Sequence, residues 1–170
     1  MTGQKRIYLA SPLGFAASTR GFMAETIARL AEVVTVVNPW DDTSFAADFE
    51  RTHALTDITE RRKEFHRINL GIGAKNERMI RSVDILVAVL DGVDVDSGTA
   101  AEIGYAAAVG TVVVGYRTDW RSSGDNEAAI VNLQLEYFIE HTGGTLICGD
   151  PSVDDRVLLE QAVAALRDRV

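Results

Sequence analysis

ILVAVLDGVDVDSGTAAEIGYAAA, residues 85–108, predicts a buried strand, a turn and then a helix of small residues. The continuous apolar run of residues 85–90 is typical of a strand covered on both faces, as in a parallel sheet. A turn from such a strand into a helix lies at the carboxyl edge of the sheet, where open α/β folds bind ligands. Glu102, the carboxylate within the helical part, is therefore a candidate functional residue.

The rest of the chain repeats this alternation of short apolar runs and longer amphipathic segments. Strands are expected at Ile7–Ala10, Val33–Val37, Val83–Leu90, Thr111–Tyr116 and Thr145–Cys148, and helices at Thr19–Ala31, Thr56–Arg81, Thr99–Val109 and Val153–Arg169, with a short helix after the loop Arg117–Asn126. Gly71 and Gly73 are expected to kink or divide the long helix. Because crossovers are right-handed, this order predicts a three-layer α/β sandwich, flavodoxin-like or Rossmann-like, with five mostly parallel strands. Its length fits a single domain, residues 1–170.

Charge and composition exclude several classes of partner. With 25 acidic and 17 basic residues the net charge is −8, which repels the phosphates of nucleic acids, so no nucleic-acid partner is expected. No apolar run approaches the ~20 residues that cross a bilayer, and residues 1–6 lead into a run too short for a signal peptide. We therefore expect a cytoplasmic protein with no membrane partner. The lone Cys148 fits a reducing compartment and a structural role.

No segment predicts a cofactor or a metal ion. The glycine-containing turns form neither G-x-G-x-x-G nor a G-K-[ST] ending. Counted from Asp91, Glu102 would be the twelfth position of a calcium loop, but the third and fifth positions are Val93 and Val95, which lack side-chain oxygens. The three histidines lie far apart in sequence and indicate no ligand set.

Two interpretations of Glu102 remain open from spacing alone. Thr99-Ala100-Ala101-Glu102 fits the T-x-x-E capping box, in which the glutamate only bonds the backbone at the helix start. The surrounding helix has little polar face, however, and a buried carboxylate is costly unless it is paired or used in chemistry. The positive helix N-terminus would help to keep Glu102 ionised, as a carboxylate nucleophile requires. Asp96 could supply the second carboxylate that glycosyl transfer uses, or it could simply cap the helix.

Four segments resemble the nucleoside 2-deoxyribosyltransferases and the related nucleotide N-glycosidases. They are IYLASP (7–12), NERMIRSVD (76–84), DSGTAAEIGYA (96–106) and VNL (131–133), of which the third is the specific catalytic turn. The resemblance implies a cofactor-free enzyme that transfers the 2-deoxyribosyl group between nucleobases. Its partners would be a 2′-deoxynucleoside and a free nucleobase, and it would form a homo-oligomer with active sites near subunit interfaces.

The resemblance also implies roles for particular residues. Glu102 would attack the anomeric carbon and hold a covalent deoxyribosyl intermediate, from which a second base takes the sugar with overall retention. Tyr8 would position Glu102, Asp96 would bind sugar hydroxyls, and Gly98 would leave room beside the sugar. Asn132 would contact the 5′ end of the sugar from a neighbouring subunit.

Asn76 and Ser11 bear on the choice of substrate. Where some members carry an aspartate that protonates the leaving base, this chain has Asn76, and an amide binds a base edge but cannot act as an acid. The relatives that hydrolyse deoxynucleoside 5′-monophosphates bind the phosphate with serines and an arginine, for which Ser11 and Arg20 are available. Asp96, however, replaces one such serine and would repel a phosphate. A free nucleoside is therefore the expected substrate.

Three functions follow from the sequence. The first is base exchange through Glu102. The second is hydrolysis of the N-glycosidic bond of a deoxynucleoside or a monophosphate, with water as the acceptor. The third is a non-catalytic nucleoside- or nucleotide-sensing module in which Glu102 only caps a helix. The connection Asp41–Thr56 is expected to form a lid over the base, with Trp40 or Phe45 available for stacking or for core packing.

Overall fold

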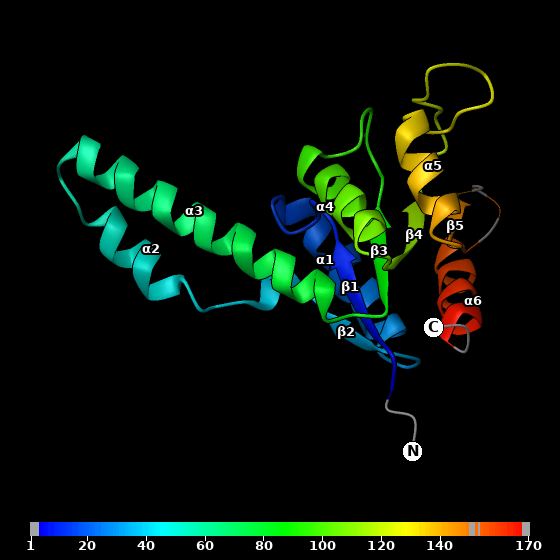
Figure 1. The fold of residues 1–170 in the computed structure, drawn as a ribbon, viewed down its shortest axis with the longest axis horizontal. Coiled ribbons are helices and arrows are strands. Elements are labelled where there is room, and N and C mark those ends of the chain that lie inside the picture. The colour runs from blue at the N-terminus through cyan, green and yellow to red at the C-terminus, as the bar shows by residue number, and fades with distance from the viewer. Residues whose placement is uncertain (1–3, 150–151, 153, 168–170) are drawn as a thin grey trace.

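The strands form one parallel sheet in the order β2-β1-β3-β4-β5, as the computed structural model shows (Figure 1). The structure describes residues 4–149, 152 and 154–167. The strands are β1 (Arg6–Ala10), β2 (Thr35–Val37), β3 (Ile85–Val89), β4 (Val112–Arg117) and β5 (Thr145–Cys148). All four pairs of neighbouring strands are parallel, which confirms the predicted α/β fold and makes its sheet of the flavodoxin-like order.

Helices cover both faces of the sheet, so the fold has three layers. They are α1 (Ala17–Leu30), α2 (Ala46–His53), α3 (Ile58–Arg81), α4 (Ser97–Ala108), α5 (Leu133–His141) and α6 (Asp155–Arg167), with a short 3₁₀ helix, η1, at Pro39–Asp41. One hydrophobic core joins α1 and α6 to the sheet, and the other joins α3, α4 and α5 to the opposite face. Val153 and residues 168–169 of the predicted last helix lie outside the described residues.

Successive side chains of β1 point to opposite faces of the sheet. Ile7 and Leu9 belong to the core under α1 and α6, whereas Tyr8 belongs to the core under α4. β3 is buried along its whole length, as its continuous apolar run predicts. Tyr8 pairs in register with Leu86 of β3, and its ring lies on the face of the sheet that α4 covers.

The chain leaves neighbouring strands β1 and β3 in opposite directions across the sheet. From β1 it crosses to β2 at one edge, and from β3 it proceeds through β4 to β5 at the other edge. In open α/β sheets this reversal leaves a crevice at the carboxyl ends of the two strands, where ligands bind. Ala10 ends β1 and residues 90–96 follow β3, so the loops after both strands meet there.

The segment between β2 and β3 differs from the sequence expectation. Residues 46–53 of the predicted connection form α2, and α3 is one helix that continues through Gly71 and Gly73. Figure 1 shows α3 extending away from the sheet with α2 beside its outer part. Gly71 is needed because a Cβ there would lie 2.8 Å from the ring of Phe45, which precedes α2. The glycine thus allows a close contact between segments instead of breaking the helix.

The described helices include none that is both long enough and apolar enough to cross a membrane.

Gly71→Ala and Gly73→Ala, at two nearby positions of α3, should differ in their effect on stability. A Cβ at position 73 meets nothing within 4 Å, so Gly73→Ala should stabilise the fold by up to about 1 kcal/mol through helix propensity. Gly71→Ala should lose that gain or become destabilising because the new methyl group displaces Phe45. Urea denaturation of both variants measures the difference, and equal stabilisation would contradict the close packing of Phe45 on α3.

Candidate active site

A pocket of about 790 Å³ lies at the crevice between the loops after β1 and β3. Its walls come from the loop after β1, from η1 and α2, from one face of α3 and from the start of α4. The residues that line it are Ser11, Phe15, Pro39, Trp40, Asp42, Thr43, Phe45, Ala46, Phe49, Asn69, Ile72, Asn76, Asp96, Ser97, Gly98, Thr99 and Glu102. The pocket therefore joins residues from both ends of a stretch of more than 90 positions.

Glu102 is held in this pocket by two side chains from different elements. The hydroxyl of Tyr8 donates a hydrogen bond of 2.7 Å to Oε1 of Glu102. The amide of Asn76, on α3, donates to the same oxygen over 3.3 Å. Among the described residues, none donates a hydrogen bond to Oε2 of Glu102. The carboxylate is thus fixed through one oxygen and keeps the other available.

The start of α4 resolves the alternative in which Glu102 caps the helix. Asp96 is the N-cap: its Oδ2 accepts from the backbone N–H of Thr99 over 2.9 Å and from the Thr99 hydroxyl over 3.3 Å. Glu102 lies well inside the helix, so the capping-box interpretation is wrong. The expectation that the positive helix N-terminus keeps Glu102 ionised is wrong as well, because that effect fades within the first turn.

Burial sets the protonation of both members of the Tyr8–Glu102 pair. Desolvation is the largest influence on the pKa of Glu102 and raises it, and the negative charge of Asp96 raises it further. The hydrogen bonds from Tyr8 and Asn76 stabilise the ionised form and partly oppose this rise. Desolvation and the neighbouring carboxylate raise the pKa of Tyr8 far above its ordinary value. Tyr8 therefore remains a protonated hydrogen-bond donor, and Glu102 is a carboxylate whose charge is poorly solvated.

The structure brings together most of the residues singled out from the sequence. Asn76, Gly98 and Ser11 line the pocket with Glu102, and the fully buried Tyr8 reaches Glu102 from the sheet. Ser11 has its hydroxyl turned to the backbone N–H of Leu13, at 3.2 Å.

Asn132 is the exception among the predicted site residues. It is exposed and does not line this pocket. Its Oδ1 accepts from the backbone N–H of Gln134 over 2.9 Å and caps α5. Within one chain, Asn132 is therefore an N-cap residue and no part of the pocket.

The aromatic wall of the pocket was only partly foreseen. Trp40 and Phe45, both named from the sequence, line the pocket together with Phe15 and Phe49. The rings of Phe15 and Trp40 meet edge to face at 4.6 Å, and the Trp40 indole donates to the carbonyl of Ser11 over 3.0 Å. Phe49 was missed because α2 was not predicted, and Phe15 because it follows a turn with no periodic pattern.

Two polar residues of the pocket also escaped the sequence analysis. Asn69 lies seven residues before Asn76 on α3, with Ile72 between them on the same face, so helical spacing alone could have found it. Asp42, just after η1, also lines the pocket and forms an ion pair of 2.5 Å with Lys75 of α3. No side chain of Lys, Arg or His from the described part of the chain lines the pocket, whereas three carboxylates do.

Arg20, considered from the sequence as a phosphate ligand, points elsewhere. Its Nε donates to the carbonyl of Gly14 over 3.0 Å, and the side chain does not line the pocket. Nor do the described residues contain a group of three or more His, Cys, Asp or Glu side chains placed to hold a metal ion.

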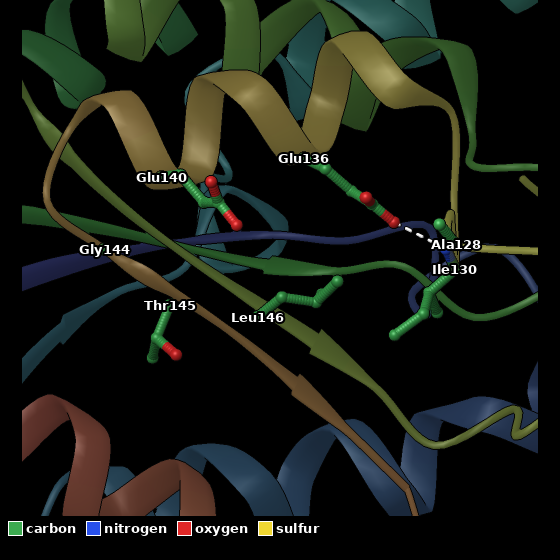
Figure 2. A pocket seen from close by; sticks show the side chains of 7 residues that line it. All are labelled: Ala128, Ile130, Glu136, Glu140, Gly144, Thr145 and Leu146. Carbon is green, nitrogen blue, oxygen red and sulfur yellow. Dashed lines mark hydrogen bonds between the residues drawn. The ribbon is translucent and has the colours of Figure 1, made fainter.

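A second hollow, of about 380 Å³, lies between α5 and β5 (Figure 2). Glu136 points toward residues 128–130 and accepts from the backbone N–H groups of Ile130 and Val131, so its carboxylate is used to hold the loop before α5. None of the residues that line this hollow also lines the Glu102 pocket. We assign it no chemical role.

The fold and the pocket together define a flavodoxin-like α/β protein with a carboxylate site at the switch point of its sheet. The sequence profile of the nucleoside 2-deoxyribosyltransferase family matches residues 7–134, and the chain belongs to this family.

Three solved structures share the fold over nearly the whole chain. A conserved protein from Enterococcus faecalis has 23% identity and a TM-score of 0.59, covering 99% of this chain and 100% of its own. A 2-deoxyribosyltransferase from Leishmania mexicana has 24% identity and a TM-score of 0.57, with 96% and 97% covered. A 2-deoxyribosyltransferase from Bacillus psychrosaccharolyticus has 20% identity and a TM-score of 0.53, with 95% of both chains covered. A search of curated proteins found no match.

Glu102→Gln should stabilise the fold at neutral pH, because it removes a carboxylate whose ionisation burial disfavours. The pKa of Glu102 is raised by folding, so ionisation costs the native state stability as pH rises above the value of an unfolded glutamate. The gain should therefore be present at pH 7 and vanish below about pH 4, where wild-type Glu102 is protonated in both states.

Urea denaturation at both pH values measures this difference. Glu140→Gln, at an exposed glutamate of α5, is the matched control and should change little at either pH. A destabilised Glu102→Gln protein at pH 7 would contradict the desolvation of this carboxylate.

Proposed function

We propose that the protein transfers the 2-deoxyribosyl group of a 2′-deoxynucleoside to a second nucleobase through a covalent intermediate on Glu102. The observation that carries this proposal is the carboxylate of Glu102, which lines a pocket of about 790 Å³. Tyr8 and Asn76 fix it through Oε1, and no described residue donates a hydrogen bond to Oε2. Membership of the nucleoside 2-deoxyribosyltransferase family supports the same chemistry. So do the activities named for the Leishmania mexicana and Bacillus psychrosaccharolyticus proteins.

The reaction would proceed by two displacements at the anomeric carbon. Oε2 of Glu102 forms a bond to C1′ while the N-glycosidic bond breaks and its electron pair stays with the departing base. A nitrogen of the second base then attacks C1′ and releases the carboxylate, so two inversions give overall retention. The departing base takes a proton from water and the incoming base loses one, because the amide of Asn76 has no acidic proton to supply.

Tyr8 would orient the carboxylate of Glu102 and stabilise its negative charge. Its hydroxyl holds Oε1 and stabilises the ionised form of Glu102 against the burial that raises the pKa of this group. Burial in turn favours attack, because a carboxylate that is poorly solvated sheds little water when it reacts. A tyrosine donor therefore maintains an anion that remains reactive.

The sugar would lie between Glu102 and the turn at the start of α4. Both hydrogen bonds that Asp96 accepts go to Oδ2, which leaves Oδ1 for a sugar hydroxyl. A Cβ at Gly98 would lie 3.0 Å from Oδ2 of Asp96 and would press on the side chain that caps α4. Asn132 would reach the 5′ end of the sugar only from a second copy of the chain, which makes a homo-oligomer part of the proposal.

The base would pack against the aromatic wall formed by Phe15, Trp40 and Phe45. Asn69 and Asn76 lie on the α3 face beside it, and their amides both donate and accept hydrogen bonds with a base edge. The segment from η1 to α2 supplies Trp40 and Phe45, and it is the part of the structure that would cover a bound base.

A free nucleoside fits the charge of the pocket better than a monophosphate. Asp42, Asp96 and Glu102 contribute negative charge, and the described lining contains no cationic side chain to offset a phosphate dianion. Lys75 lies nearby but is paired with Asp42. These charges favour transfer or hydrolysis of an uncharged nucleoside.

Chromatography of the protein incubated with deoxyinosine, with and without free adenine, tests this function. We expect deoxyadenosine only when adenine is present, and without adenine no more hypoxanthine than the one equivalent per enzyme that leaves as the intermediate forms. Glu102→Ala should lower the rate by about 10⁴-fold or more because the nucleophile is removed, whereas Glu140→Ala should retain it. Free deoxyribose in both reactions would show a hydrolase instead, and binding of deoxyinosine without any product would show a sensing module.

A further inference from the structure

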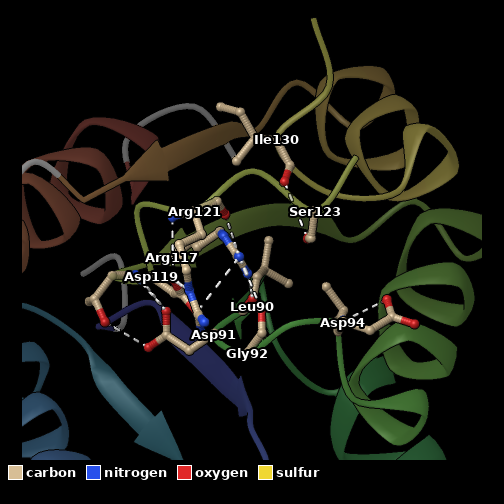
Figure 3. A network of polar contacts seen from close by, with 11 residues as sticks. Leu90, Asp91, Gly92, Asp94, Arg117, Asp119, Arg121, Ser123 and Ile130 are labelled. Carbon is tan, nitrogen blue, oxygen red and sulfur yellow. Dashed lines mark hydrogen bonds and ion pairs between the residues drawn. The ribbon is translucent and has the colours of Figure 1, made fainter. Parts of the chain in front are cut away.

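The turn that leads into α4 is tied to the loop after β4 by Arg117, the last residue of β4. Its guanidinium donates to the carbonyl of Leu90, to that of Gly92 over 3.0 Å and to that of Arg121 over 2.7 Å. Figure 3 shows this side chain between the two loops. One arginine therefore holds backbone carbonyls both in the loop after β3 and in the loop after β4.

Asp91 makes the reverse connection, from the β3 side to the β4 side. Its Oδ1 accepts from the backbone N–H groups of Thr118 and Asp119 over 2.6 and 2.9 Å. Its Oδ2 accepts from the hydroxyl of Thr118 over 2.8 Å. The two residues thus form a reciprocal clamp, here called the Arg117–Asp91 clamp, in which each side chain binds the backbone of the opposite loop.

The burial of Arg117 shows that packing alone does not explain it. Its side chain is 1% exposed, and its guanidinium lies 3.9 Å from the carboxylate of Asp119, too far for a hydrogen bond. A guanidinium removed from water is costly unless hydrogen bonds replace its hydration, and an apolar side chain would fill the same space at no such cost. Arg117 provides three hydrogen bonds to backbone carbonyls, which a methionine of similar size could not make.

The loop after β3, which the clamp holds, leads directly to pocket residues. Residues 91–96 run from the clamp to Asp96, the N-cap of α4, and Glu102 follows within the same helix. We propose that Arg117 and Asp91 are positioning residues, which fix the turn so that Asp96 and Glu102 are correctly placed against the sugar. This inference rests on the proposed function. Displacements near 1 Å at reacting groups lower rates by up to about 100-fold.

Arg117→Met tests the clamp, with Arg121→Met as the matched control. Arg121 lies in the same loop and pairs with Asp119, but its side chain is 61% exposed and does not reach the β3 side. We expect Arg117→Met and Asp91→Asn to lower kcat by about 10- to 100-fold in folded protein, and Arg117→Lys, which keeps a donor, to recover part of the loss. Arg121→Met should stay within about twofold, as its bonds are surface bonds.

Hydrogen exchange supplies a readout that does not depend on turnover. In Arg117→Met, Arg117→Lys and Asp91→Asn, amides of residues 91–99 should exchange faster than in wild type, while those of β1 stay protected. Wild-type kcat in Arg117→Lys and Asp91→Asn together with unchanged exchange at 91–99 would overturn the clamp, even if Arg117→Met failed to fold. A wild-type protein without activity would instead refute the proposed function, and exchange alone would then decide whether the clamp orders the turn.

Discussion

One partly buried hydrogen bond, from the hydroxyl of Tyr8 to the carboxylate of Glu102, is the constraint on which the arrangement of the site depends. It joins β1 to α4 and fixes the direction of a carboxylate that burial disfavours as an anion. Tyr8 is fully buried, so it reaches Glu102 only if β1 and α4 pack at this distance. The small residues of α4 permit that approach, and Ile103 and Ala106 pack into the same core as Tyr8.

The topology of the sheet then decides what else reaches Glu102. Because β1 and β3 are neighbours and the chain leaves them in opposite directions, the loops after both strands meet over the site. α3 enters from a third direction and places Asn76 against the same carboxylate oxygen. The aromatic wall comes from Phe15 in the loop after β1, from Trp40 in η1 and from Phe45 and Phe49 at α2. α2 lies beside the outer part of α3, so the proposed base site extends farther from the sheet than the proposed sugar site (Figure 1).

The sequence predicted the layers of the fold because its strands are continuous apolar runs, and it predicted Glu102 because a carboxylate stands out in an alanine-rich helix. It could not predict which oxygen or donor Glu102 meets, since Tyr8 and Asn76 lie 94 and 26 positions away. Spacing alone could not exclude the T-x-x-E capping box, which the structure does because Asp96 caps the helix three residues before Thr99. Gly71 misled because propensity describes the isolated helix, whereas Phe45 packs on it from outside.

The central claim is that Oε2 of Glu102 bonds covalently to the sugar. Rapid acid quenching of the enzyme with a 2′-deoxynucleoside and no acceptor base, followed by peptide mass spectrometry, tests it most directly. The account predicts one deoxyribosyl group on the peptide that contains Glu102, lost when an acceptor base is added and absent from Glu102→Gln. Base exchange at the wild-type rate with no adduct, or with the adduct on another residue, would contradict it.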